Sequence, residues 1–122
     1  MSKRILAVDD EPHILKLVSF SLKARGFEVI EASDGLSAIE IAEHEQPDLV
    51  LMDVMMPALD GYEACRRIKA NPKTAHIPVV MLTAKTQVAE HKTGLDAGAL
   101  DYICKPFTPK DLVAQVNGFL GE

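Results

Sequence analysis

Short apolar runs alternate with longer amphipathic stretches along the whole chain. The runs have strand length and are rich in Val, Ile and Leu. The predicted strands are RILAV (4–8), FEVIEA (27–32), LVLM (49–52), PVVML (78–82) and YIC (102–104). Two of these runs lack polar alternation, which is typical of strands that are buried on both faces of a sheet.

The stretches between the runs carry helix periodicity and helix boundaries. A first helix follows Pro12, with apolar residues at four-residue spacing, and ends before Gly26. Asp34 and Asp60 are placed to cap a second and a third helix. The last helix follows Pro109. The order is therefore a strand followed by a helix, five times over.

The fourth predicted helix, over residues 85–97, is the weakest. Val88 and Leu95 are its anchors, and Gly94 interrupts it at a cost of up to about 1 kcal/mol. We expect this helix to be loosely held. Strands alternating with helices nevertheless predict an α/β fold, with a doubly wound parallel sheet covered by helices on both faces.

The composition narrows the class of protein. With 122 residues we expect one domain, 1–122, with no output domain attached. The net charge of -5 lacks the basic footprint of a nucleic-acid binder, and no apolar run is long enough to span a membrane. The apolar run near the N-terminus is too short for a signal peptide, so a cytoplasmic location is expected.

Cysteine and histidine offer no separate site. Cys65 and Cys104 lie far apart without a CxxC motif and are predicted to be reduced core thiols. The four histidines lack the spacing of metal ligands and are predicted to be surface residues.

The chemistry is predicted at the carboxyl ends of the strands, which share one edge of a parallel sheet. The first strand ends in Asp9 and Asp10, the third in Asp53, the fourth in Thr83 and the fifth in Lys105. Three close carboxylates would repel one another unless a hard cation such as Mg2+ lay between them. Such a cation, a lysine and a hydroxyl suit the binding of a phosphoryl group, and aspartate is an established phosphoryl acceptor.

The sequence resembles the receiver domain of bacterial two-component response regulators, including the chemotaxis regulators. The resemblance covers essentially the whole chain. Its motifs, in order, are AVDDEP, LVLMDVMMPALDG, VVMLTA and DYICKPF. It implies a flavodoxin-like five-stranded sheet with strand order 2-1-3-4-5.

The resemblance also implies roles for single residues. Asp53 would be the phosphoacceptor. Asp10 and Asp53 would ligate Mg2+ directly together with the backbone carbonyl of Met55, and Asp9 would act through a metal-bound water. Lys105 would pair with the phosphoryl group.

A conformational switch is implied as well. Thr83 would move to the phosphate while the ring of Tyr102 turns inward. The surface made by the fourth helix, the fifth strand and the fifth helix would then change and control partner binding. The peptide bond between Lys105 and Pro106 would be cis.

The implied protein is a signalling phosphoacceptor, which catalyses only its own phosphorylation and slow dephosphorylation. Its partners would be a histidine kinase or phosphotransfer protein and a downstream protein target, with no direct contact to nucleic acid or membrane. Regulators with a winged-helix output typically carry Asp where Leu100 stands and Arg where Gln115 stands. Without those salt bridges we expect a monomer or weak dimer. Both a stand-alone regulator and a receiver excised from a longer protein fit the sequence.

Three other functions fit less well. A haloacid-dehalogenase-type phosphatase needs an acid two residues after its nucleophile, where Met55 stands. A Rossmann-like nucleotide binder needs a GxGxxG motif after the first strand, where DDEP stands. A degenerate receiver that only binds proteins would not need the complete set of acids, Thr83 and Lys105.

Overall fold

The computed structural model describes residues 3–84 and 97–121. The strands are β1 (Arg4–Val8), β2 (Glu28–Ala32), β3 (Leu49–Asp53), β4 (Val79–Ala84) and β5 (Asp101–Lys105). The helices are α1 (Pro12–Lys23), α2 (Gly35–Glu45), α3 (Gly61–Ala70) and α5 (Pro109–Leu120). The fourth predicted helix, over residues 85–97, lies almost wholly outside the described residues.

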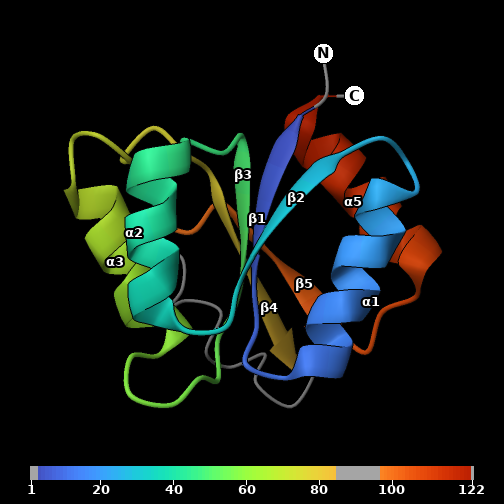
Figure 1. Ribbon diagram of the computed structural model, residues 1–122, viewed down its shortest axis with the longest axis horizontal. Helices are drawn as coiled ribbons and strands as arrows, with labels where there is room; N and C mark the ends of the chain where they lie inside the picture. The colour runs from blue at the N-terminus through green and yellow to red at the C-terminus, as the bar shows by residue number, and fades with distance from the viewer. Residues whose placement is uncertain (1–2, 85–96, 122) are drawn as a thin grey trace.

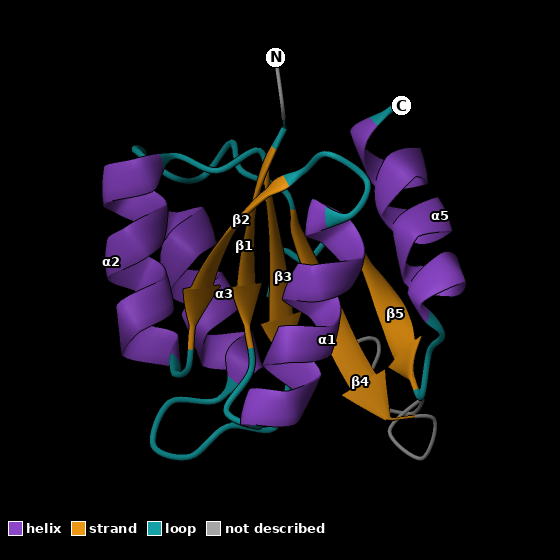
Figure 2. Cartoon of the chain, turned by 45° about the vertical axis from the view of Figure 1, so that its right-hand side comes forward, coloured by secondary structure: helices purple, strands orange, loops and turns teal. Residues whose placement is uncertain are grey.

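The five strands form one parallel sheet in the order β2-β1-β3-β4-β5. Figure 2 shows their arrowheads at a common edge. Helices α1 and α5 cover one face, while α2 and α3 cover the other (Figure 1). The predicted α/β architecture and strand order are therefore confirmed. Within the described residues, no helix is long and apolar enough to cross a bilayer.

Each strand supplies side chains to two cores, because successive residues point to opposite faces. In β1, Leu6 and Val8 pack beneath α2 and α3, whereas Ile5 and Ala7 pack beneath α1 and α5. Burial on both faces explains why the central strands read as continuous apolar runs. The polar residues that follow these runs are consequently held by a rigid sheet.

Local capping chemistry starts the helices at the predicted places. The Asp34 side chain accepts a hydrogen bond from the backbone N–H of Ser37 at 2.8 Å, and Asp60 accepts one from Glu63 at 2.9 Å. These bonds satisfy N–H groups that have no partner within the helix. Thr108 caps α5 in the same way. Both predicted aspartate caps are confirmed.

Two details differ from the sequence-based expectation. The strands β4 and β5 extend beyond their apolar runs, because Thr83 pairs with Cys104 and Ala84 with Lys105 across the sheet. Cys65 is a buried thiol, and burial raises its pKa to about 11. Cys104, in contrast, is only half-buried, so the prediction that both cysteines are core thiols is wrong for Cys104.

Candidate functional site

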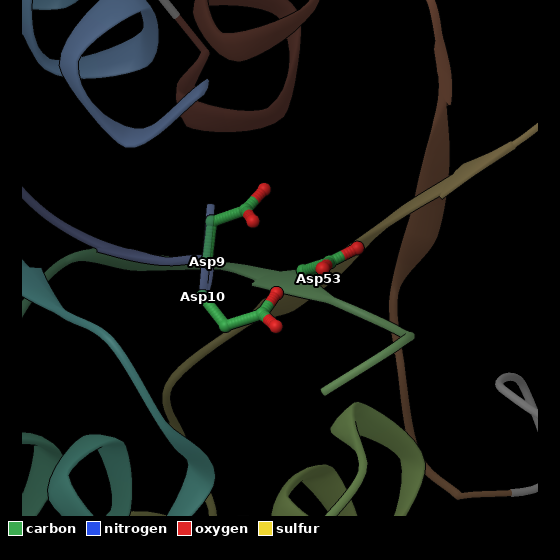
Figure 3. A group of neighbouring side chains, drawn as sticks. All are labelled: Asp9, Asp10 and Asp53. Atoms are coloured by element: carbon green, nitrogen blue, oxygen red, sulfur yellow. The ribbon is translucent and has the colours of Figure 1, made fainter. Parts of the chain in front are cut away.

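Three carboxylates gather at the carboxyl edge of the sheet. Asp9 and Asp10 follow β1, and Asp53 ends the neighbouring strand β3 (Figure 3). One oxygen of each carboxylate lies within 4.8 Å of the others. Asp9 and Asp53 are only 1% and 4% exposed, whereas Asp10 is exposed to solvent. The predicted convergence of these three side chains is therefore present in the structure.

Lys105 crosses from β5 to this cluster. Its Nζ lies 3.0 Å from Oδ1 of Asp53 and 3.1 Å from Oδ2 of Asp9. Three carboxylates and one ammonium leave a formal charge of -2. The positions of the strand ends along the sequence predicted that Lys105 would lie beside the site. They did not predict its ion pair with Asp9, which joins residues 96 positions apart.

Burial and charge shift the titration of both members of the pair formed by Asp53 and Lys105. Burial raises the pKa of the Asp53 carboxyl from 3.8 to about 6, with smaller contributions in the same direction from Asp9 and Asp10. The hydrogen bond and charge of Lys105 oppose that rise. Burial alone would lower the pKa of Lys105, but its interactions with Asp53 and Asp9 outweigh burial and raise it.

The two aspartates after β1 have different surroundings. Oδ1 of Asp9 accepts a hydrogen bond from the backbone N–H of Glu11 at 2.9 Å, and Oδ2 of Asp9 forms the ion pair with Lys105. Both of its oxygens are thus engaged. Asp10 makes no hydrogen bond or ion pair with any residue in 3–84 or 97–121, so its carboxylate is free to bind a ligand from solvent.

Thr83 on β4 and Tyr102 on β5 lie on the same face of the sheet as each other. Thr83 is buried in β4, and its hydroxyl lies 3.4 Å from the carbonyl oxygen of Ala84. Tyr102 pairs in register with Met81, which is two residues before Thr83 and points to the same face. The Tyr102 side chain is buried. Their assignment as a switch stays a prediction.

The remaining predicted features lie around the loop after β3 and at the end of β5. Met55 lies between β3 and α3 and is 64% exposed. The peptide bond from Lys105 to Pro106 is cis, as the resemblance implied. Leu100 and Gln115 are both exposed.

The donor set fits a hard divalent cation. Carboxylate oxygens are the ligands that Mg2+ prefers, and one or two carboxylates suffice when waters complete its shell. The formal charge of -2 at the cluster matches the charge of such an ion. An acidic edge of this kind, with a cation and Lys105, can hold a phosphoryl group against a carboxylate nucleophile.

Comparison with known proteins decides the family. The model of the response regulator receiver domain matches residues 5–117. This chain belongs to that family. Receiver domains are the phosphoacceptor signalling modules of two-component systems, and this is the chain's class of function.

Individual relatives agree with the assignment of a receiver domain. The probable transcriptional regulator ycf27 of Cyanophora paradoxa is 47% identical over 118 residues, which are 97% of this chain and 48% of that protein. The receiver domain therefore spans about half the length of this relative.

Two solved structures share the fold closely. The chemotaxis response regulator CheY4 of Vibrio cholerae has a TM-score of 0.91 at 31% identity, covering 97% of this chain and 98% of that one. The receiver domain of sensor histidine kinase PA1611 from Pseudomonas aeruginosa PAO1 has a TM-score of 0.90 at 33% identity, covering 100% of both chains. The latter structure has a magnesium ion coordinated in its active-site cleft.

Proposed function

We propose that Asp53 accepts a phosphoryl group from a histidine kinase or a phosphotransfer protein. One observation carries the proposal: Asp53 is a buried carboxylate held by Lys105, with two further carboxylates within 4.8 Å. Such an arrangement costs stability, and it supplies what a phosphoacceptor needs, namely a positioned carboxylate and charge neutralisation.

The proposed metal is Mg2+. Asp10 and Asp53 would bind it directly with the backbone carbonyl of Met55, and Asp9 would act through a water. The different surroundings of the two neighbouring aspartates support this division, because Asp10 has no partner among the described residues while both oxygens of Asp9 have partners. When bound, Mg2+ offsets the negative charge of the transferring group. The magnesium ion in the PA1611 receiver domain supports the same choice.

The residues of the chain supply position and charge for the transfer. One carboxylate oxygen of Asp53 forms a bond to phosphorus while the bond from phosphorus to the donor's leaving atom breaks. The leaving group departs with the electron pair of that bond. Lys105 would then pair with a phosphoryl oxygen, and Thr83 would donate a hydrogen bond to another. The domain would catalyse only its own phosphorylation and the slow hydrolysis of the resulting aspartyl phosphate.

We propose that phosphorylation is read by a switch. The phosphoryl group adds negative charge that Thr83 and Lys105 can engage in one arrangement only, which biases a two-state equilibrium. Tyr102 would follow Thr83, because both lie on one face of the sheet. The affected surface would include β5 and α5 together with the predicted helix at 85–97, and would bind a downstream protein.

The donor protein would approach beside Lys105. A hollow of about 370 Å³ lies there, lined by Ile14, Leu17, Ala84, Lys105, Pro106 and Phe107. Its lining is almost wholly apolar, so it offers a partner hydrophobic contact area beside Lys105, the residue that pairs with Asp53. The similarity to a transcriptional regulator supports control of transcription as the downstream output.

Phosphoryl uptake from a small acyl phosphate tests the proposal. The protein would be incubated with acetyl phosphate, with Mg2+ or with EDTA, and its intact mass followed over time. We expect the mass of one phosphoryl group to appear in Mg2+ only. Asp53→Asn should abolish uptake, because an amide is not a competent nucleophile. Uptake by Asp53→Asn at the wild-type rate would overturn the assignment.

A further inference from the structure

Gly61, the first residue of α3, lies directly against the main chain of Asp53. A Cβ atom at Gly61 would lie 2.2 Å from the carbonyl oxygen of Asp53 and 3.0 Å from its carbonyl carbon. It would also lie 2.8 Å from Cε of Met81. The backbone of Gly61 does not have a positive φ. Glycine is therefore required here for space and not for an unusual conformation.

The two close contacts differ in how easily they could be relieved. Cε of Met81 is the end of a flexible side chain and can move aside. The Asp53 carbonyl belongs to the last residue of β3, which pairs with Leu82 of β4, and the next N–H, from Val54, donates to the Leu82 carbonyl at 3.1 Å. Movement of that carbonyl would therefore distort the pairing between β3 and β4. It would also shift the main chain that carries the Asp53 carboxylate.

Gly61 also closes the loop between β3 and α3. Its backbone N–H donates to the carbonyl oxygen of Val54 at 3.0 Å. If α3 moved outward to make room for a side chain, this bond would lengthen and the loop that carries Met55 would open. Either response changes the position of groups that Asp53 needs as neighbours.

We propose that Gly61 is a positioning residue for phosphoryl transfer. Because Gly61 lacks a Cβ atom, the start of α3 can pack directly against the Asp53 main chain. This contact would hold the Asp53 carboxylate in place relative to Lys105 and Asp10. Glycine is a poor helix former, and Asp60 already caps α3, so neither helix propensity nor capping accounts for it. The inference rests on the proposed role of Asp53 as phosphoacceptor.

Two other glycines provide matched controls. Gly35, the first residue of α2, would place a Cβ atom 2.9 Å from the carbonyl oxygen of Leu59, in the same loop but away from Asp53. A Cβ atom at Gly118, in α5, would meet nothing within 4 Å beyond its own helix and chain neighbours. Gly35→Ala thus introduces a close backbone contact without touching Asp53, and Gly118→Ala introduces none.

The experiment compares Gly61→Ala, Gly35→Ala and Gly118→Ala with the wild type. Sucrose would be added throughout, since it favours the folded state. The measurements are urea unfolding, amide chemical shifts of the metal-free protein, the Kd for Mg2+, and the rate of phosphoryl uptake from acetyl phosphate at saturating Mg2+. Only folded samples, identified by their amide spectra, enter the comparison.

We expect Gly61→Ala to shift the amide signals of Asp53 and Val54 without metal present. Its Mg2+ affinity should fall about tenfold, as for loss of a group that orients a ligand, and its uptake rate should fall at least about tenfold. Gly35→Ala should lose stability but keep its Mg2+ affinity and uptake rate within about twofold of wild type, because its contact leaves Asp53 in place. Gly118→Ala should change neither the Mg2+ affinity nor the uptake rate.

A double variant keeps the inference testable where the single variant is poorly folded. Gly61→Ala with Met81→Leu removes the contact to Cε of Met81 and retains the one to Asp53. Wild-type Mg2+ affinity and uptake in this variant, or in folded Gly61→Ala, would overturn the positioning role. If the wild type itself took up no phosphoryl group, the proposed function would fail, while the Asp53 amide shift and the Mg2+ affinity would still test Gly61.

Discussion

Replacing Asp53 by asparagine should stabilise the metal-free protein at neutral pH. Asp53 is 4% exposed, and burial raises its pKa to about 6 in the folded state. The folded protein therefore holds the Asp53 proton more tightly than the unfolded chain does. As pH rises from about 4 to about 6, the free energy of unfolding therefore falls, because ionising the buried carboxyl is unfavourable. Above about pH 6 the full cost of ionised Asp53 is present.

The magnitude follows from the two pKa values. One pKa unit corresponds to about 1.4 kcal/mol, so a pKa of about 6 against 3.8 makes ionised Asp53 cost about 3 kcal/mol at neutral pH. Asparagine is neutral, like the protonated carboxyl, and can still accept a hydrogen bond from Lys105. The pKa of about 6 already includes the opposing hydrogen bond and charge of Lys105, so no further correction for that bond is needed. Asp53→Asn should therefore be more stable by about 3 kcal/mol.

Urea unfolding in EDTA would measure the difference at several pH values. The gain should be largest above about pH 7 and should nearly vanish by about pH 3, below the ordinary pKa of 3.8, where Asp53 is neutral in both the folded and the unfolded protein. Asp101→Asn, at an exposed position of β5, controls for the removal of one negative charge from the surface. An Asp53→Asn variant that is no more stable than wild type at neutral pH, or equally stabilised at both ends of the range, would refute the reasoning.

The same contacts predict the effects of metal and of three other substitutions. Mg2+ at ten times its Kd should stabilise the wild type by about 1.4 kcal/mol, and Asp10→Ala should remove most of that gain; an unchanged melting-temperature response would contradict direct ligation by Asp10. Thr83→Ala should still accept a phosphoryl group but lose most of the amide shift changes over residues 97–105, so a full-sized response would disprove the coupling. Asp60→Ala should cost about 1 kcal/mol of stability in urea unfolding, because the bond to the Glu63 N–H is lost; no loss would show that the cap is not stabilising.

Much of the fold could be predicted because its signals are local. Apolar periodicity located the five strands, and the aspartates before α2 and α3 located those helix starts. Strand ends were less predictable. Thr83 and Ala84 belong to β4 because β5 pairs with them, and pairing with a distant segment leaves no mark in the apolar pattern.

The candidate site was predictable as a set but not in its contacts. Parallel strands bring their carboxyl ends to one edge, which was enough to group Asp9, Asp10, Asp53 and Lys105. The double ion pair of Lys105 and the burial of Asp53 depend on side-chain packing between distant strands. Gly61 was also missed as a functional residue, although a glycine directly after a capping aspartate was a signal of close backbone approach.

The central claim is that Asp53 itself carries the phosphoryl group. The most direct measurement is residue-level localisation after exposure to acetyl phosphate and Mg2+. Borohydride reduces an acyl phosphate to the alcohol with release of phosphate, so a phosphorylated aspartate is converted to homoserine, which tandem mass spectrometry can locate. We expect homoserine at position 53 only, and none when EDTA replaces Mg2+. Homoserine at another aspartate, or equal conversion in EDTA, would contradict the account.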